Sequence, residues 1–140
     1  MTQPVDIRPY RSSDEPQVVA LWEHVFADEP PWNSPRSMIE RKLTVQPNLF
    51  LVAQVGSRVV GSVLAGFDGV RGWIYHLCVS PAERRRGIAT LLVRAAEREL
   101  SQLGCPKVNL QVRAGNEAVV AFYRSLGYEV EERTSLGRCL

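Results

Sequence analysis

Hydrophobic and polar residues follow two different periods along this 140-residue chain. Short apolar runs rich in β-branched residues predict strands, and apolar residues that recur every three to four positions predict amphipathic helices. The predicted strands cover residues 5–9, 49–55, 58–67, 73–79, 107–112 and the segment from 128 onward. The predicted helices cover about 12–25, 36–45, 87–103 and 116–126.

The order of these segments predicts an α/β (α+β) fold. Helices interspersed among strands indicate a mixed sheet with helices covering its faces. Gly56 and Ser57 separate two strand segments and predict a hairpin. The strand at 73–79, the helix at 87–103 and the strand at 107–112 predict a right-handed parallel crossover. No linker or repeat interrupts the chain, so we expect a single domain over residues 1–140.

Composition narrows the function classes only slightly. Hydrophobic residues make up 45% and charged residues 23%, and the net charge of +2 is too small to indicate nucleic-acid binding. Three dispersed cysteines without a Cys/His cluster predict free thiols, a reducing compartment and no metal. We therefore expect a cytoplasmic protein with neither nucleic acid nor membrane as a partner.

The pattern Arg84-x-x-Gly87-x-Ala89 lies between the strand at 73–79 and the helix at 87–103. A helix start presents free N–H groups and a positive dipole end, which suits a phosphate or pyrophosphate. Glycine at position 87 would let the phosphate approach the backbone. The pattern alone is short, and a solvated arginine run before an ordinary helix explains it equally well.

A second motif downstream changes this balance. In the segment that begins at Asn116, Tyr123 follows after six residues, and Gly127 and Tyr128 follow after three more. With both motifs in this order, the chain resembles the GNAT superfamily of acyl-CoA-dependent N-acetyltransferases over essentially its full length. Shorter matches, including Pro31-Trp32-Asn33 and Ser135-Leu136-Gly137, resemble the bacterial YpeA-like acetyltransferases.

The resemblance implies a GNAT fold: about seven strands, a V-shaped splay between strands four and five, and four helices. It implies acetyl-CoA as the acyl donor, with pantetheine on the backbone of Leu77, Cys78 and Val79. Family members place an asparagine like Asn116 near the pantetheine arm, and many pair through their sheets, so a homodimer stays open. The implied pyrophosphate loop comprises Arg84, Arg85, Arg86, Gly87, Ile88 and Ala89.

The resemblance also implies transfer of an acetyl group to a primary amine by direct attack in a ternary complex. Tyr123 is then the general acid, because a phenol can stabilise or protonate the leaving thiolate. The alternative is a core tyrosine on the apolar face of the helix. Asn116 is equally well explained as a helix N-cap, and its side chain can serve both roles.

The base is where this chain departs from the family pattern. Many members carry a glutamate at the position of Trp73. We expect deprotonation by water or solvent, with His76 as the catalytic side-chain candidate and a satisfied core histidine as its alternative. Cys78 invites a covalent acyl-cysteine route, but a small buried residue explains it better because no nearby charge lowers its pKa.

The acceptor is not specified by the sequence. Trp32 and Tyr75, with the acidic pair Asp28 and Glu29, are candidates to line its pocket, since carboxylates and aromatic faces attract a cation. Small amines, lysines and peptide N-termini all remain open. A non-catalytic acyl-CoA-binding sensor is the alternative function, and the short arginine run argues against a nucleic-acid module.

Overall fold

The computed structural model describes residues 3–140 as two compact units, one ending at Leu110 and the other covering Gln111–Leu140. The first unit contains a five-stranded sheet with three α-helices, and the second contains one α-helix. The strands are β1 (Val5–Pro9), β2 (Phe50–Val55), β3 (Arg58–Phe67), β4 (Gly72–Val79) and β5 (Val108–Leu110). The helices are α1 (Glu15–Val25), α2 (Pro35–Lys42), α3 (Ile88–Gln102) and α4 (Glu117–Ser125).

The sheet is mixed, as predicted. Its strands lie in the order β1-β2-β3-β4-β5, with antiparallel pairing from β1 to β4 and parallel pairing between β4 and β5. The predicted hairpin is confirmed, since Val55 pairs with Arg58 across the turn at Gly56 and Ser57. The parallel crossover through α3 is confirmed as well.

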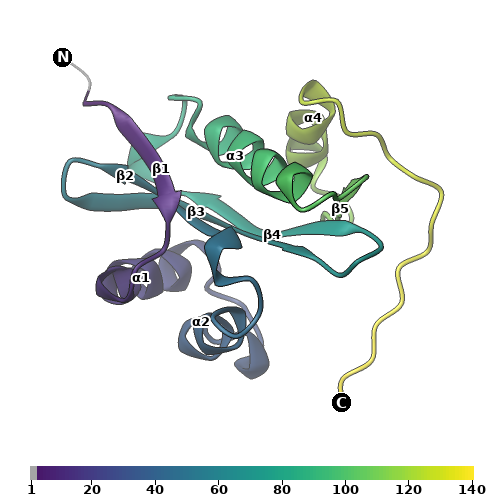
Figure 1. Cartoon of the computed structure of the whole chain (residues 1–140), viewed down its shortest axis with the longest axis horizontal. Coiled ribbons are helices and arrows are strands. Elements are labelled where there is room, and N and C mark those ends of the chain that lie inside the picture. The colour runs from purple at the N-terminus through teal and green to yellow at the C-terminus, as the bar shows by residue number, and fades with distance from the viewer. Residues whose placement is uncertain (1–2) are drawn as a thin grey trace. The chain divides into compact units, whose positions relative to one another are not determined.

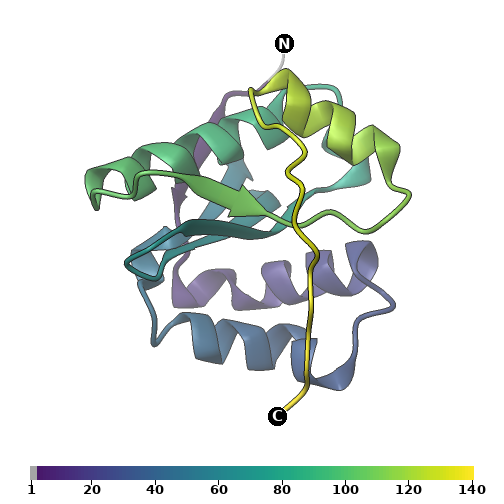
Figure 2. The same cartoon turned by 90° about the vertical axis from the view of Figure 1, so that its right-hand side faces the viewer.

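Helices cover both faces of this sheet in the first unit. Figure 1 shows α1 and α2 on one face and α3 on the other, and the turned view in Figure 2 agrees. β3 is central and almost entirely buried because it is covered from both sides. The face under α1 and α2 is packed with apolar side chains, including Val18, Trp22, Ile39, Phe50, Val52 and Leu64.

α3 packs closely against the sheet because of a glycine on β3. A Cβ atom at Gly61 would lie 2.9 Å from the carbonyl oxygen of Cys78 and 3.1 Å from Cδ1 of Leu92. Any larger residue would therefore push the helix away from the strands. The amphipathic character of α3 is confirmed, and its buried face comprises Ile88, Leu92, Val93, Ala95, Ala96 and Leu100. Leu91 and Leu103, predicted on the same face, are exposed.

The predicted number of about seven strands is wrong for the described residues, which form five. No strand occurs within 111–140, where the final strand or hairpin was expected. The segment after Tyr128 contains few apolar side chains, and two of them, Val130 and Leu136, are exposed. Pairing of this segment as a strand would therefore bury little apolar surface. The predicted strand at 107–112 shortens to β5, which pairs with only Gly72–Ile74 of β4.

Two absences concern the part of the chain that the structure describes. Within residues 3–140, no helix has the length and apolar character that a membrane crossing requires. Over the same residues, His, Cys, Asp and Glu side chains form no group of three or more that could hold a metal ion.

Candidate active site

The loop before α3 forms a backbone cradle, here called the anion cradle and defined as the backbone of residues 84–89. Arg85 and Gly87 have left-handed backbones, with φ of 69° and 72°. No hydrogen bond within the described residues engages the backbone N–H groups from Arg85 to Ala89. Successive free N–H groups at the positive end of a helix dipole bind anions. The predicted pyrophosphate loop therefore has the required backbone form.

The three arginines of this loop have different surroundings. Arg84 and Arg85 are exposed, whereas Arg86 is half-buried and donates 2.7 Å to the carboxylate of Glu83. Glu83 also accepts from Arg58 at 2.9 Å, and these two arginine hydrogen bonds lower the pKa of its carboxyl group. Glu83 thus links the loop to Arg58 of β3 and is itself held by Arg86, which the sequence pattern did not reveal.

β4 contains a bulge at His76 and Leu77. Ser62 pairs with Cys78, and Leu64 pairs with Tyr75, so two residues of β4 face one residue of β3. His76 takes the left-handed conformation with φ of 51°, which is uncommon for a residue with a side chain. This segment contains no turn residue from which the bulge could have been predicted.

The outer edge of β4 is free of a strand beyond the bulge. Pairing between β4 and β5 ends at Ile74 and Leu110. Within the unit that ends at Leu110, residues 75–79 therefore have a strand only on the β3 side. This edge includes the backbone of Leu77, Cys78 and Val79, and such an edge can accept an extended ligand as an additional strand.

The Cys78 thiol belongs to a buried polar network. Its Sγ lies 3.3 Å from Oγ of Ser62, which also accepts a 2.8 Å hydrogen bond from the indole of Trp22. Burial raises the pKa of the Cys78 thiol to about 11, so the thiol is protonated at neutral pH. The network indicates a packing role and argues against a nucleophile.

The His76 imidazole projects from the bulge between two aromatic rings. Its centroid lies 5.0 Å from the ring of Trp22 and 4.2 Å from that of Phe26. Burial lowers the pKa of His76, although the Glu29 carboxylate acts in the opposite direction. The ring forms no hydrogen bond within the described residues, so it lacks the partner that a satisfied core histidine would have.

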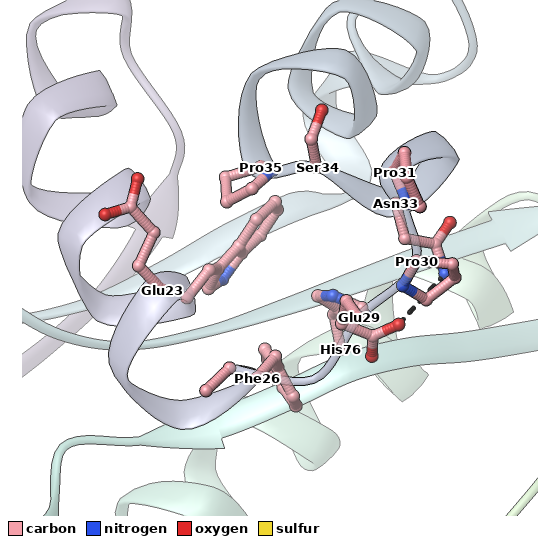
Figure 3. Close-up of a pocket in the computed structure, with 11 residues that line it drawn as sticks. Glu23, Phe26, Glu29, Pro30, Pro31, Asn33, Ser34, Pro35 and His76 are labelled. Atoms are coloured by element: carbon pink, nitrogen blue, oxygen red, sulfur yellow. Dashed lines mark hydrogen bonds between the residues drawn. The ribbon is translucent and has the colours of Figure 1, made fainter.

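Two pockets meet at His76 on the face of the sheet that carries α1 and α2. The first, here called the acidic pocket, has a volume of about 420 Å³ and contains Glu23 and Glu29 (Figure 3). The second, here called the basic pocket, has a volume of about 470 Å³ and contains Arg41 and Lys42. Asn33 and His76 line both pockets, so the two adjoin at these residues.

The aromatic residues predicted for the acceptor side have different positions. Tyr75 is exposed and lines the basic pocket, and its ring stacks on Trp73 at 6.5 Å. Trp32 is 58% exposed and lines neither pocket, although its carbonyl oxygen accepts from Arg41. Glu29 lines the acidic pocket and accepts a 3.2 Å hydrogen bond from Asn33.

The unit at Gln111–Leu140 contains the second motif. Asn116 caps α4, with its side-chain oxygen accepting from the N–H of Val119 at 3.3 Å. Tyr123 is buried, and its ring meets those of Phe122 and Tyr128 edge-on. Burial raises the pKa of Tyr123 to about 12. Within 111–140, its hydroxyl forms no hydrogen bond, so it remains available as a donor.

Comparison with known proteins assigns the family. The model of the acetyltransferase (GNAT) family matches residues 16–128. An acetyltransferase of Yersinia enterocolitica is 46% identical over 97% of this chain and 96% of its own length. An acetyltransferase of Sodalis glossinidius is 46% identical over 94% of this chain and 92% of its own length. The predicted YpeA-like subgroup is not addressed by these names and stays a prediction.

Solved structures agree on the fold. The aminoglycoside acetyltransferase AAC(6')-Iy, determined with a CoA-linked bisubstrate analogue, aligns with a TM-score of 0.82 and 20% identity, covering 98% of this chain and 99% of that one. Ard1 from Thermoplasma volcanium aligns with a TM-score of 0.80 and 21% identity, covering 91% and 84%. The mixed sheet, the helix-start cradle and the family match identify this chain as a member of the GNAT family of acetyltransferases.

Proposed function

We propose that this protein transfers the acetyl group of acetyl-CoA to a primary amine by direct attack within a ternary complex. The observation that carries the proposal is the anion cradle, in which the N–H groups from Arg85 to Ala89 are unbonded within the described residues and the exposed Arg84 and Arg85 side chains lie beside them. A pyrophosphate carries two negative charges and needs several such donors. The CoA-linked analogue bound by the aminoglycoside acetyltransferase of the same fold supports this donor.

The free edge of β4 supports pantetheine binding next to the cradle. Pantetheine contains amide groups that can pair with backbone N–H and C=O groups as a further strand would. Leu77, Cys78 and Val79 supply those groups without requiring particular side chains. Pairing along this edge would bring the thioester carbonyl to the bulge at His76.

The reaction requires one bond to form and one to break. The lone pair of the amine nitrogen attacks the thioester carbonyl carbon, the C–S bond breaks, and CoA leaves as a thiolate. We propose His76 as the group that receives the amine proton, directly or through a water molecule. Its lowered pKa keeps the imidazole neutral at neutral pH, and it has no hydrogen-bond partner in the described residues to compete.

Tyr123 is proposed to assist departure of the thiolate. A phenol with a pKa of about 12 stays protonated at neutral pH and can donate a hydrogen bond. Full proton transfer to a thiolate, whose conjugate acid has a pKa of about 8.5, is unfavourable from such a phenol. Stabilisation of the thiolate by hydrogen bonding is therefore the favoured form of general-acid assistance.

Isothermal titration with acetyl-CoA, followed by an amine screen monitored by thiol release, tests this function. We expect binding at one site per chain and thiol release that depends on the added amine. Acetyl-CoA binding without amine-dependent thiol release across a broad panel would favour the non-catalytic CoA-binding alternative. That alternative is suggested by Trp73, which stands where many family members carry a glutamate. Failure to bind acetyl-CoA would overturn both functions.

A further inference from the structure

The two pockets that meet at His76 carry opposite charge. The side chains of Glu23 and Glu29 line the acidic pocket, and no lysine or arginine is present in its described lining. Glu29 is half-buried and accepts a hydrogen bond from the Asn33 amide. Figure 3 shows the Glu29 carboxylate beside His76, with Asn33 hydrogen-bonded to it. A ligand group that enters here meets a net negative field, which favours an ammonium.

The basic pocket has the opposite character. Nζ of Lys42 donates 2.6 Å to the carbonyl oxygen of Ala65 and 2.8 Å to that of Val45, and both acceptors are uncharged. Arg41 likewise donates to a carbonyl oxygen, that of Trp32. No carboxylate is present in the described lining of this pocket.

Lys42 is half-buried and has no acidic partner within the described residues. Charged groups removed from water usually have a counter-ion, because desolvation is costly. An ammonium has three donors, and the two carbonyl bonds leave one available. The Arg41 guanidinium uses one of its five donors on Trp32 and is otherwise exposed. An anionic ligand group would satisfy both cations.

We propose that the acceptor is a zwitterion of the amino-acid or short-peptide class. Its amine lies on the acidic side of His76, and its carboxylate is bound by Arg41 and Lys42 in the basic pocket. The shared lining residues Asn33 and His76 connect the two ends, so one small molecule can occupy both pockets. Met38 and Leu64 add apolar surface for a hydrocarbon side chain. The proposal rests on the proposed acetyltransferase function.

Matched acceptors test the charge requirement. Leucine, leucinamide, 3-methylbutylamine and 1,4-diaminobutane are compared as acceptors, together with the dipeptide Leu-Gly and its amide, under saturating acetyl-CoA. We expect kcat/KM for leucine or Leu-Gly to exceed that of its amide by about tenfold or more, as for loss of a charged hydrogen-bonded pair. Equal rates for acid and amide, or a preference for the diamine, would overturn the proposal.

Substitutions of Arg41 and Lys42 test whether the basic pocket is the source of the preference for a carboxylate-bearing acceptor. Arg41→Gln should raise KM for the carboxylate-bearing acceptor and leave that of its amide unchanged, and Lys42→Met should do the same more strongly. Arg36→Gln is the matched control, because Arg36 lies on the same helix, pairs with Glu15 and lines neither pocket. Lys42→Met also removes two bonds to carbonyls, so Arg41→Gln keeps the test valid if that variant unfolds.

Two outcomes distinguish failure of the zwitterion proposal from failure of the proposed acetyltransferase function. Thiol release with an amide or diamine, but no preference for acids, would reject the zwitterion and leave the acetyltransferase function intact. Absence of thiol release with every amine, despite binding of acetyl-CoA, would reject catalysis. A loss of the acid preference in Arg36→Gln equal to that in Arg41→Gln would also contradict the assignment to the basic pocket.

Discussion

The anion cradle and the two pockets at His76 lie in the same unit, but the cradle consists of backbone groups and the pockets consist of side chains. The cradle is a run of consecutive residues in which Arg85 and Gly87 are left-handed and the N–H groups from Arg85 to Ala89 form no hydrogen bond within the described residues. The pockets are made of side chains from α1, α2, β3, β4 and the loop before α2. Donor recognition therefore depends on local backbone shape, and acceptor recognition depends on side chains brought together by the whole fold.

This difference separates two kinds of substitution. A change that alters the backbone of the cradle should weaken acetyl-CoA binding and leave the chemistry of bound substrates intact. A change that removes a reacting side chain should reduce turnover and leave acetyl-CoA binding intact. The predictions below test this separation, from the largest expected effect to the smallest.

Tyr123→Phe removes one oxygen from a proposed catalytic side chain. We expect kcat to fall by about 10³-fold, within the range for loss of a general acid, because the leaving thiolate loses its donor. The dissociation constant for acetyl-CoA should change little, as measured by titration calorimetry. Tyr128→Phe is the control, because its ring contacts Tyr123. Full turnover by Tyr123→Phe at all pH values would contradict the acid role.

His76→Asn removes the proposed base and keeps a residue that tolerates the left-handed backbone. We expect kcat/KM to fall by about 10²-fold. Because burial lowers the pKa of His76 below 6.5, the wild-type rate should fall as the pH drops through that lowered pKa, where the imidazole becomes protonated. This acid limb should disappear in the variant.

The matched control for His76 is His24→Asn, which changes an exposed histidine on α1 that lines neither pocket. A pH–rate profile of His76→Asn that superimposes on the wild type would remove His76 from the mechanism. Deprotonation by water or solvent would then be the remaining route.

Gly87→Ala tests the cradle. The Cβ atom of an alanine there would lie within 4 Å of no other atom of the protein. Alanine is nevertheless disfavoured in the left-handed conformation, and its methyl group would project where a phosphate would approach. We expect the dissociation constant for acetyl-CoA to rise by about tenfold, or about 1.4 kcal/mol. The kcat at saturating acetyl-CoA should be nearly unchanged.

Gly104→Ala is the control for backbone strain. Gly104 follows the other end of α3, has φ of 82° and is equally open to a Cβ atom. Both variants should lose a similar amount of thermal stability, but only Gly87→Ala should weaken binding. An equal loss of affinity in the two would mean that strain in α3, rather than the cradle, controls binding.

Cys78→Ala should have the smallest effect. The thiol has a pKa raised to about 11, so it is not a thiolate at neutral pH, and we expect kcat within about twofold of the wild type. Intact-mass measurement during turnover should show no acetyl group on the wild-type chain. A trapped acetyl-cysteine that disappears in Cys78→Ala would establish the covalent route instead.

Much of the fold follows from local patterns. β1, the β2–β3 hairpin, α3 and α4 agree with the periodicity of their own residues, since each buries a face that the pattern already specifies. The final strand after Tyr128 was predicted wrongly for the described residues. A strand needs a partner strand as well as a suitable sequence. That segment has few apolar residues whose burial would stabilise such pairing.

The candidate site likewise has features that local sequence predicts and features that it does not. The cradle was predictable because a glycine, a preceding strand and a following helix are all read within a few residues. The bulge at His76 was not, because the register between β3 and β4 is set by packing on both faces of the sheet. The role of Glu83 in linking the loop to β3 likewise depends on Arg58, which lies 25 residues away in the chain.

The sequence by itself determined the family, the helix-start cradle and the candidate residues Asn116 and Tyr123, because each depends on short-range spacing. Only the tertiary structure decided that His76 has no hydrogen-bond partner in the described chain, that Cys78 is held in a buried network, and that oppositely charged pockets adjoin. Those properties come from residues far apart in sequence, and their charge, burial and contacts exist only once the sheet and its helices have assembled.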